Sequence, residues 1–291
     1  MYRLLFLHKD YKLMGVFGRM TKEIAIVYPV AGLSSRFGGK IKQFARVGPE
    51  GETLIEYSVS QALRAGFDKI VFVVGEKTSG LFKEMFGDNY NGVPVFYVFQ
   101  SYDKEKRNKP WGTAEILCCV KDVIDCPFVF CNGDDIYGEN TFRELYEHLL
   151  ESDECATIGY RLIDSIPENG SVHRGIFKIV DNYVEGLKET LNISKDRLNE
   201  IGLSYDSHCS MNIFGLHPEV IDLMRWEFMK FKRENSDDKD IEFLIPNELS
   251  KLVERGKIKM RVYSAEDKWF GVTNPEDEEI VRRELRNEVE S

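Results

Sequence analysis

Residues 24–43 read IAIVYPVAGLSSRFGGKIKQ, an apolar run followed by a loop rich in glycine, serine and basic side chains. The run 24–30 has β-branched residues and no polar alternation, which is typical of a strand covered on both faces. Glycines let backbone N–H groups approach an anion closely, and arginine and lysine can add charged contacts to phosphate. The glycines alone fit an ordinary βα turn equally well. Arg36 and Lys42 favour a phosphate loop, which matches neither the Walker pattern nor GxGxxG.

Strand and helix patterns alternate through the first half of the chain. The sequence predicts strands at 69–74, 93–99 and 128–131, and helices at 54–65, 79–86, 113–124 and 139–150. This order predicts an α/β domain with parallel strands, helices on both faces of the sheet, and a ligand site at the carboxyl ends of the strands.

The second half is less regular. We expect strands at 156–163, 175–180, 210–215 and 259–263, helices at 219–232 and 242–255, and a polar, weakly patterned stretch at 188–207. No internal repeat or low-complexity linker interrupts the chain, so we predict one domain from residue 20 to 291. Residues 1–19 would be an extension or the result of a misassigned start.

The composition limits the class of protein. Of 291 residues, 43% are hydrophobic and 30% charged, and the formal net charge of -10 argues against a nucleic-acid partner. The six cysteines include no CxxC pair, so we expect reduced thiols. No apolar run reaches the roughly 20 residues of a membrane span, and no signal-peptide pattern is evident. We therefore expect a cytoplasmic protein without a membrane partner.

A second motif, Asn132-Gly133-Asp134-Asp135, follows a predicted apolar strand. Carboxylates at a strand's carboxyl end, facing a phosphate loop, suit a hard cation such as Mg²⁺. A solvated acidic turn that caps the next helix is the alternative interpretation.

Several motifs in order along residues 24–280 together resemble a known family. They are RFGG at 36–39, KQ at 42–43, VGP at 47–49, KPWGTA at 109–114, NGDDIYG at 132–138, NGSVHRG at 169–175, SMN at 210–212 and WFGVT at 269–273. The chain resembles the sugar nucleotidyltransferases (NDP-sugar pyrophosphorylases), and among them a little-characterised bacterial subfamily. This resemblance implies a single Rossmann-like, GT-A-like domain with a mixed, mostly parallel central sheet flanked by helices. Residues 24–150 would form the nucleotide-binding half and residues 151–291 the sugar-binding half.

The resemblance also implies residue roles. The catalytic residues would be Arg36, Lys42 and Asp134, and the nucleotide would be bound by Ala31, Gly32, Ser34, Ser35, Gln100, Lys109, Gly112, Thr113 and Asp135. The sugar would be bound by Asn169, Gly170, Arg174, Glu189 and Asn212, and Mg²⁺ by Asp134 and Thr273. Thr273 stands where family members often have an aspartate, so either water and Thr273 complete the coordination or the metal site is weaker.

The implied reaction transfers a nucleotidyl group from a nucleoside triphosphate, with UTP favoured, to a sugar 1-phosphate and releases pyrophosphate. The nucleophile would be a phosphate oxygen of the sugar 1-phosphate, which is already anionic and needs no general base. The lack of a recognisable Ser/His/Asp or Cys/His arrangement agrees with this. Two alternatives are a GT-A glycosyltransferase and a non-catalytic regulatory module that binds a nucleotide or a sugar phosphate. The sequence predicts no oligomeric state.

Overall fold

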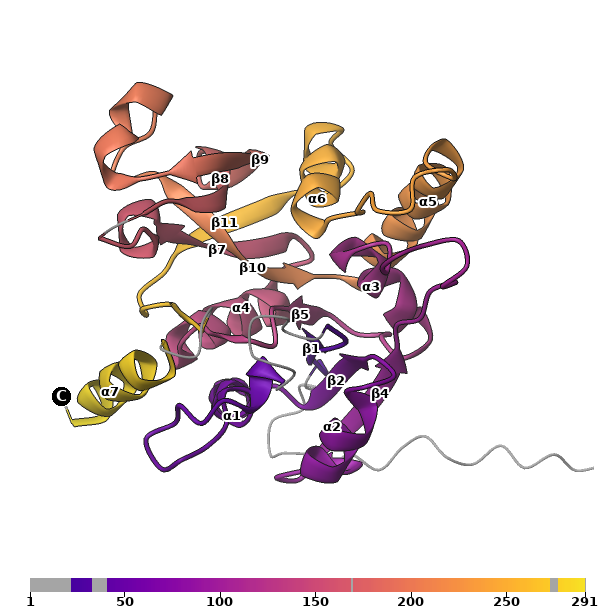
Figure 1. The fold of residues 1–291 in the computed structure, drawn as a ribbon, viewed down its shortest axis with the longest axis horizontal. Helices are drawn as coiled ribbons and strands as arrows, with labels where there is room; N and C mark the ends of the chain where they lie inside the picture. The colour runs from indigo at the N-terminus through magenta and orange to yellow at the C-terminus, as the bar shows by residue number, and fades with distance from the viewer. Residues whose placement is uncertain (1–21, 33–40, 169, 273–276, 291) are drawn as a thin grey trace, which may run out of the picture.

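The computed structural model describes residues 22–32, 41–168, 170–272 and 277–290 as one mixed α/β domain (Figure 1). The expected extension at 1–19 lies outside these residues. The strands are β1 (Ala25–Pro29), β2 (Lys69–Val74), β3 (Asn89–Tyr90), β4 (Val93–Phe99), β5 (Phe128–Phe130), β6 (Asp135–Ile136), β7 (Cys155–Arg161), β8 (Val172–Val180), β9 (Tyr183–Ile193), β10 (His208–Leu216), β11 (Met260–Ser264) and β12 (Phe270–Gly271). The α-helices are α1 (Leu54–Ala65), α2 (Ser79–Phe86), α3 (Thr113–Cys119), α4 (Glu139–Glu151), α5 (Pro218–Glu234), α6 (Ile245–Glu254) and α7 (Asp277–Glu290).

The main sheet joins a parallel part to an antiparallel part. Its strand order is β3-β4-β2-β1-β5-β10-β7-β11-β9-β8, and β8 also pairs with β10, so the second part curls back on itself. Strands β4, β2, β1 and β5 run parallel, as expected, whereas β10 runs antiparallel to β5, β7 and β8. The single α/β domain with a mixed sheet is confirmed; parallel pairing prevails in the first half, whereas in the second half only β7 and β11 pair in parallel among the described strands. The second half is built on the hairpin β8–β9, whose local pairing is antiparallel.

Helices cover both faces of the parallel part, and β1 shows how. Ile26 and Tyr28 face a core shared with α1, α2 and α4, whereas Ala25 and Val27 face a core shared with α3, α5 and α6. All four side chains are completely buried, as the unbroken apolar run predicted. In Figure 1, α3 and α5 lie together on the right, opposite α1, α4 and α7.

The segment between β1 and α1 is anchored at its far end. A short 3₁₀ helix, η2 (Lys42–Phe44), leads to Ala45, whose carbonyl accepts the backbone N–H of Leu54 at 2.8 Å. Thr53 and Glu56 form a capping box that begins α1, in which each side chain bonds the other residue's backbone N–H. These contacts hold Lys42 beside the end of β1.

Most predicted elements are present with bounds shifted by a few residues, and two segments differ more. The helix predicted at 113–124 is α3 followed by a 3₁₀ turn (Val120–Asp122). The weakly patterned stretch 188–207 contains the end of β9, which the sequence did not predict. The side chains of β9 are mostly exposed or half-buried, so its apolar alternation is faint.

Two further expectations can be compared with the structure. All six cysteines are free thiols, as predicted. Within the described residues, no helix is both long enough and apolar enough to span a membrane.

Candidate active site

The carboxyl ends of β1, β4 and β5 surround a cavity of about 350 Å³. The sequence predicted a ligand site at this edge, because parallel strands point their carboxyl ends the same way. The cavity is lined by Pro29, Ala31, Gly32, Gln43, Gln100, Pro110, Gly112, Thr113, Ile116, Asn132, Asp134 and Glu242. Six of these were predicted site residues: Ala31, Gly32, Gln100, Gly112, Thr113 and Asp134.

The two motifs of the sequence meet at one ion pair. The Nζ atom of Lys42 donates to Oδ2 of Asp134 at 2.8 Å, although the residues are 92 positions apart. The Lys42 side chain is 13% exposed and that of Asp134 is 32% exposed, so the pair is partly shielded from water. A lysine and a carboxylate thus lie together where β1 and β5 end.

Asp135 occupies a different environment from its neighbour. Asp135 is 5% exposed, and Nδ2 of Asn132 donates to its Oδ2 at 2.9 Å. Burial, with a smaller effect from the charge of Asp134, raises the pKa of Asp135 to about 7. On the other side Asp135 pairs with Gly271 of β12, where an added Cβ would lie 3.1 Å from Oδ1. Asp135 is therefore a buried support for the motif and does not line the cavity.

The carboxylate at this edge fits a Mg²⁺ ion whose other ligands are mostly water and phosphate oxygens. Asp134 offers a carboxylate at the cavity, and Mg²⁺ commonly takes one or two carboxylates together with water and phosphate oxygens. No group of three or more His, Cys, Asp or Glu side chains that could enclose a metal occurs among the described residues. Thr273, the other predicted ligand, lies outside them.

One side of the cavity is formed by the start of α3. Gly112 precedes the helix with φ +118°, and a Cβ there would lie 2.5 Å from the carbonyl oxygen of Phe243. The Phe243 carbonyl accepts a hydrogen bond from the Ala114 N–H at 2.9 Å, and the Phe243 N–H donates to the Trp111 carbonyl. Only glycine suits this close approach.

Gln100 and Lys109 fall on this side in different positions. Gln100 lines the cavity and its Nε2 donates to Oε2 of Glu115 at 2.9 Å. Lys109 instead forms an ion pair with Glu242 at 3.1 Å, with both side chains about two-fifths exposed. Lys109 is not among the lining residues, so it lies at the rim.

Three of the five predicted sugar-binding residues, Arg174, Glu189 and Asn212, lie on three adjacent strands. Gly175 of β8, next to Arg174, lies opposite Glu189 of β9 and opposite Ser210 of β10, two residues before Asn212. Asn212 has φ +57° at an irregularity in the β10–β7 pairing, a conformation that is uncommon for residues other than glycine. Glu189 is exposed.

Arg174 is half-buried and contacts residues of two other segments. Its Nη2 donates to the Ser165 carbonyl at 3.2 Å, and its guanidinium lies 5.4 Å from the ring centre of Trp269. Burial lowers the pKa of Arg174, while Asp135 and Glu189 lie close enough to raise it. Gly170 is in an exposed turn with φ +102°.

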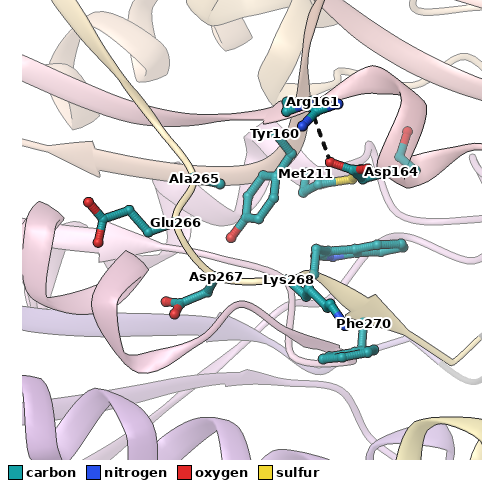
Figure 2. Close-up of a pocket in the computed structure, with 11 residues that line it drawn as sticks. Tyr160, Arg161, Asp164, Met211, Ala265, Glu266, Asp267, Lys268 and Phe270 are labelled. Carbon is teal, nitrogen blue, oxygen red and sulfur yellow. Dashed lines mark ion pairs between the residues drawn. The ribbon is translucent and has the colours of Figure 1, made fainter. Parts of the chain in front are cut away.

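Figure 2 shows a second cavity, of about 530 Å³. It is lined by Tyr160, Arg161, Asp164, Ser165, Met211 and the segment 265–270. Figure 2 shows this segment passing below β7, with Phe270 at the floor and the ion pair between Arg161 and Asp164 at the rim. None of the predicted sugar-binding residues lines it, but Ser165, Met211 and Trp269 connect its wall to Arg174 and Asn212.

Tyr137 links the two regions. Its fully buried phenol accepts the backbone N–H of Asn132 at 3.1 Å and donates to the carbonyl of Met211 at 2.7 Å. The Asp134 loop and the strand that carries Asn212 are thereby held together.

Some predictions and omissions remain to be placed. Ser34, Ser35, Arg36, Asn169 and Thr273 lie outside the described residues. Sequence reasoning did not assign roles to Gln43, Asn132, Glu115 and Glu242, which line the cavity or hold a lining residue. Gln43 adjoins Lys42 and is 5% exposed, and its position next to a proposed phosphate ligand was the available signal.

The sequence was compared with models of known protein families. The model of the nucleotidyl transferase family matches residues 39–277. The chain belongs to the nucleotidyl transferase family.

Individual relatives are more distant. The chain is 32% identical over 91 residues to the UTP–glucose-1-phosphate uridylyltransferase AglF of Haloferax volcanii, a match that covers 31% of this chain and 34% of that protein. The match thus spans about a third of the relative's length.

Solved structures share the fold over nearly the whole chain. The inositol-1-phosphate CTP transferase from T. maritima has a TM-score of 0.65 at 17% identity, covering 93% of this chain and 97% of the other. A putative glucose-1-phosphate thymidylyltransferase from Bacillus anthracis has a TM-score of 0.66 at 14% identity, covering 91% and 96%. These two proteins are named for different nucleotides and acceptors, so the shared fold does not select a substrate.

Proposed function

We propose that this protein transfers a nucleotidyl group from a nucleoside triphosphate to a sugar 1-phosphate and releases pyrophosphate. The observation that carries the proposal is the ion pair between Lys42 and Asp134, set at the carboxyl ends of β1 and β5 beside a cavity. Membership of the nucleotidyl transferase family supports the reaction class. The similarity to AglF, a UTP–glucose-1-phosphate uridylyltransferase, supports UTP and a hexose 1-phosphate as the first pair to test.

In this reaction a phosphate oxygen of the acceptor attacks the α-phosphorus of the triphosphate. A new P–O bond forms as the bond between the α-phosphorus and the bridging oxygen breaks, and that oxygen leaves with pyrophosphate. The attacking oxygen already carries charge, so no general base is needed. Catalysis then depends on alignment and on stabilising the charge that develops around the phosphorus.

The residues of the first cavity divide this work. The Lys42 ammonium, which donates to Asp134 in this structure, would donate to a phosphate oxygen when the triphosphate is bound. Arg36 is proposed to contact the phosphate beside it. Gly112 and Thr113 are proposed to lie along the nucleobase, and Ala31 and Gly32 along the triphosphate.

A divalent cation, with Mg²⁺ as our choice, would be held by Asp134, with Thr273 as a further candidate ligand. When bound, it would neutralise charge on the phosphate oxygens. The exposed fraction of Asp134 leaves room for water and phosphate in the remaining coordination positions.

We propose that the acceptor lies toward the second cavity, near Arg174, Glu189 and Asn212. Arg174 is the one cation among these three residues, and its guanidinium can bind a phosphate group in a forked geometry. Asn212 and Glu189 would then meet sugar hydroxyls, with Gly170 and Asn169 in the adjoining turn.

The test is pyrophosphate release from purified protein, with each nucleoside triphosphate offered against a panel of sugar 1-phosphates, with and without Mg²⁺. We expect metal-dependent release for one pair, and a loss of about 100-fold or more in kcat for Lys42→Gln and for Asp134→Asn. The matched controls are Lys121→Gln and Asp222→Asn, which break a surface ion pair of 2.7 Å whose residues line neither cavity and should leave turnover unchanged.

Two outcomes would refute the proposal. Triphosphate binding without turnover for any acceptor in the panel would favour a regulatory binding module. Transfer of sugar from a finished nucleotide sugar, without pyrophosphate release, would favour a glycosyltransferase.

A further inference from the structure

We infer that the outer face of α5 is a contact surface for a second copy of this chain, in which the two α5 helices pack antiparallel about a two-fold axis beside Trp226. This face has an apolar centre and opposite charges at its two ends, so the chain itself supplies the matching surface. The inference goes beyond the proposed function and does not depend on the reaction.

The outer face of α5 carries two large apolar side chains one turn apart. Trp226 is 58% exposed and Met229 is 56% exposed. They do not belong to the core side of the helix, where Val220, Met224 and Phe228 are buried. Tryptophan and methionine are enriched in protein–protein interfaces, whereas the solvated face of a surface helix usually carries charged and polar residues. The centre of this face therefore suits a protein partner.

The exposed side chains follow the spacing of a coiled-coil seam. Glu219, Asp222, Trp226, Met229 and Arg233 recur at intervals of three and four residues, and all five are exposed. At 3.6 residues per turn this spacing places them in one stripe along the helix, which we call the α5 stripe. In Figure 1, α5 lies at the outer edge of the molecule, so a second copy can approach it.

The charges of the α5 stripe are self-complementary in an antiparallel pair. Trp226 lies midway, seven residues after Glu219 and seven before Arg233. A two-fold axis beside Trp226 therefore sets Glu219 of each copy opposite Arg233 of the other, about 10 Å along the helix from the axis. A parallel pair would set like charges together at both ends, which is unfavourable.

The two end charges are available for this contact. Glu219 and Arg233 form no ion pair with another residue in the described part of the chain. Asp222, in contrast, already pairs with Lys121 at 2.7 Å. The charge contacts between copies therefore depend on Glu219 and Arg233.

The size of the contact sets the expected strength. The same axis brings the two Trp226 side chains together and places Met229 against the half-buried Leu223 of the second copy. The 17 residues of α5 span about 26 Å, and one helix pair buries less than the roughly 1,600 Å² of a standard interface. We expect a reversible dimer with a Kd of about 1–100 µM.

The experiment measures the molar mass of the full-length protein by sedimentation equilibrium across that concentration range. Trp226→Ser and Met229→Ser should each raise the Kd of the dimer by about 10-fold or more, because each removes part of the apolar centre. Leu81→Ser is the matched control, since Leu81 is 47% exposed on α2 and lies outside the α5 stripe. It should leave the Kd unchanged.

Charge reversal tests the antiparallel arrangement. Glu219→Lys and Arg233→Glu should each raise the Kd by about fivefold or more, because each sets like charges opposite one another at both ends. The double variant that carries both substitutions should dimerise about as well as the unmodified protein, since every facing pair is again opposite in sign. Thermal unfolding of each variant checks that these exposed substitutions leave the fold intact.

Several results would overturn the inference. A monomer at every concentration would do so, and so would a dimer that Trp226→Ser does not weaken or that Leu81→Ser weakens equally. A double charge variant that dimerises no better than the single variants would reject the antiparallel arrangement. Pyrophosphate release does not enter these measurements, and the α5 stripe lines neither of the two cavities proposed to bind substrates, so the outcome is separate from that of the proposed function.

Discussion

Replacing Tyr137 by phenylalanine tests whether one buried hydroxyl joins the proposed metal loop to the proposed sugar strand. The phenol accepts the N–H of Asn132 at 3.1 Å and donates to the carbonyl of Met211 at 2.7 Å. Phenylalanine preserves the ring packing against Phe142 and removes these two hydrogen bonds together with a longer one from the hydroxyl to Oδ2 of Asp135 at 3.4 Å.

The expected loss of stability can be worked from the two orphaned groups. An unpaired buried backbone group costs about 1–3 kcal/mol. Met211 is 4% exposed, so its carbonyl cannot reach bulk water, whereas Asn132 is half-buried and its N–H loses less. We expect the free energy of unfolding to fall by about 2–4 kcal/mol, measured by urea denaturation with an unchanged m-value.

Activity should fall as well, because the Asp134 loop and Asn212 would no longer share a fixed support. We expect kcat/KM to drop by about 10- to 100-fold under conditions where the variant is fully folded. Tyr183→Phe is the control, since its hydroxyl bonds Glu154 at 2.9 Å and touches neither proposed subsite. A stability loss below about 1 kcal/mol together with unchanged kcat/KM in Tyr137→Phe would refute the reasoning.

Three further predictions concern other parts of the site. Asp135→Asn should make the metal-free protein more stable than the unmodified one. The pKa of Asp135 is raised to about 7 in the folded state, so raising the pH from 4 to 7 destabilises the unmodified protein, whose unfolded chain already releases this proton near pH 4. The stability difference should therefore grow from pH 4 to pH 7, reach up to about 4 kcal/mol and then level off. Gly112→Ala should lower both stability, by about 2 kcal/mol, and triphosphate affinity, because its Cβ would meet the Phe243 carbonyl at 2.5 Å. Arg107→Met should destabilise by about 2–4 kcal/mol, since the guanidinium donates to three carbonyl groups, those of Lys109, Asp238 and Ile241.

Each of these has a measurement and a contrary outcome. Urea titrations at several pH values in EDTA check Asp135→Asn, and a stability difference that is constant with pH would contradict it. Calorimetric binding and unfolding check Gly112→Ala against Gly80→Ala, a helical position with open space around an added Cβ. Thermal unfolding of Arg107→Met within about 1 °C of the unmodified protein would show that the carbonyls find other donors.

Much of the first half could be predicted from local sequence. The run at 24–30 is apolar on both faces, so only a covered central strand suits it, and β1 has that position. The loop and the NGDD motif were each assigned to the end of an apolar strand. Because parallel strands end at the same edge, the meeting of Lys42 and Asp134 followed in outline from the element order alone.

The second half was less predictable for a physical reason. The hairpin β8–β9 and strand β10 pair with partners that are distant in the chain, and β9 has a largely exposed surface that weakens its apolar period. Asn212 takes its left-handed conformation from the irregular pairing of β10 with β7, which no local pattern records.

The sequence by itself determined the family and the parallel first half of the sheet, and it supplied the residues that we propose to hold phosphate and metal. Only the tertiary structure decided how neighbouring residues divide their roles. Asp134 faces the cavity while Asp135 is buried against β12, and Glu115, fifteen residues from Gln100, accepts a hydrogen bond from the side-chain amide of Gln100. Burial and hydrogen-bond direction are set by contacts between segments far apart in the chain, so adjacent identical side chains acquire different chemistry only when the chain is folded.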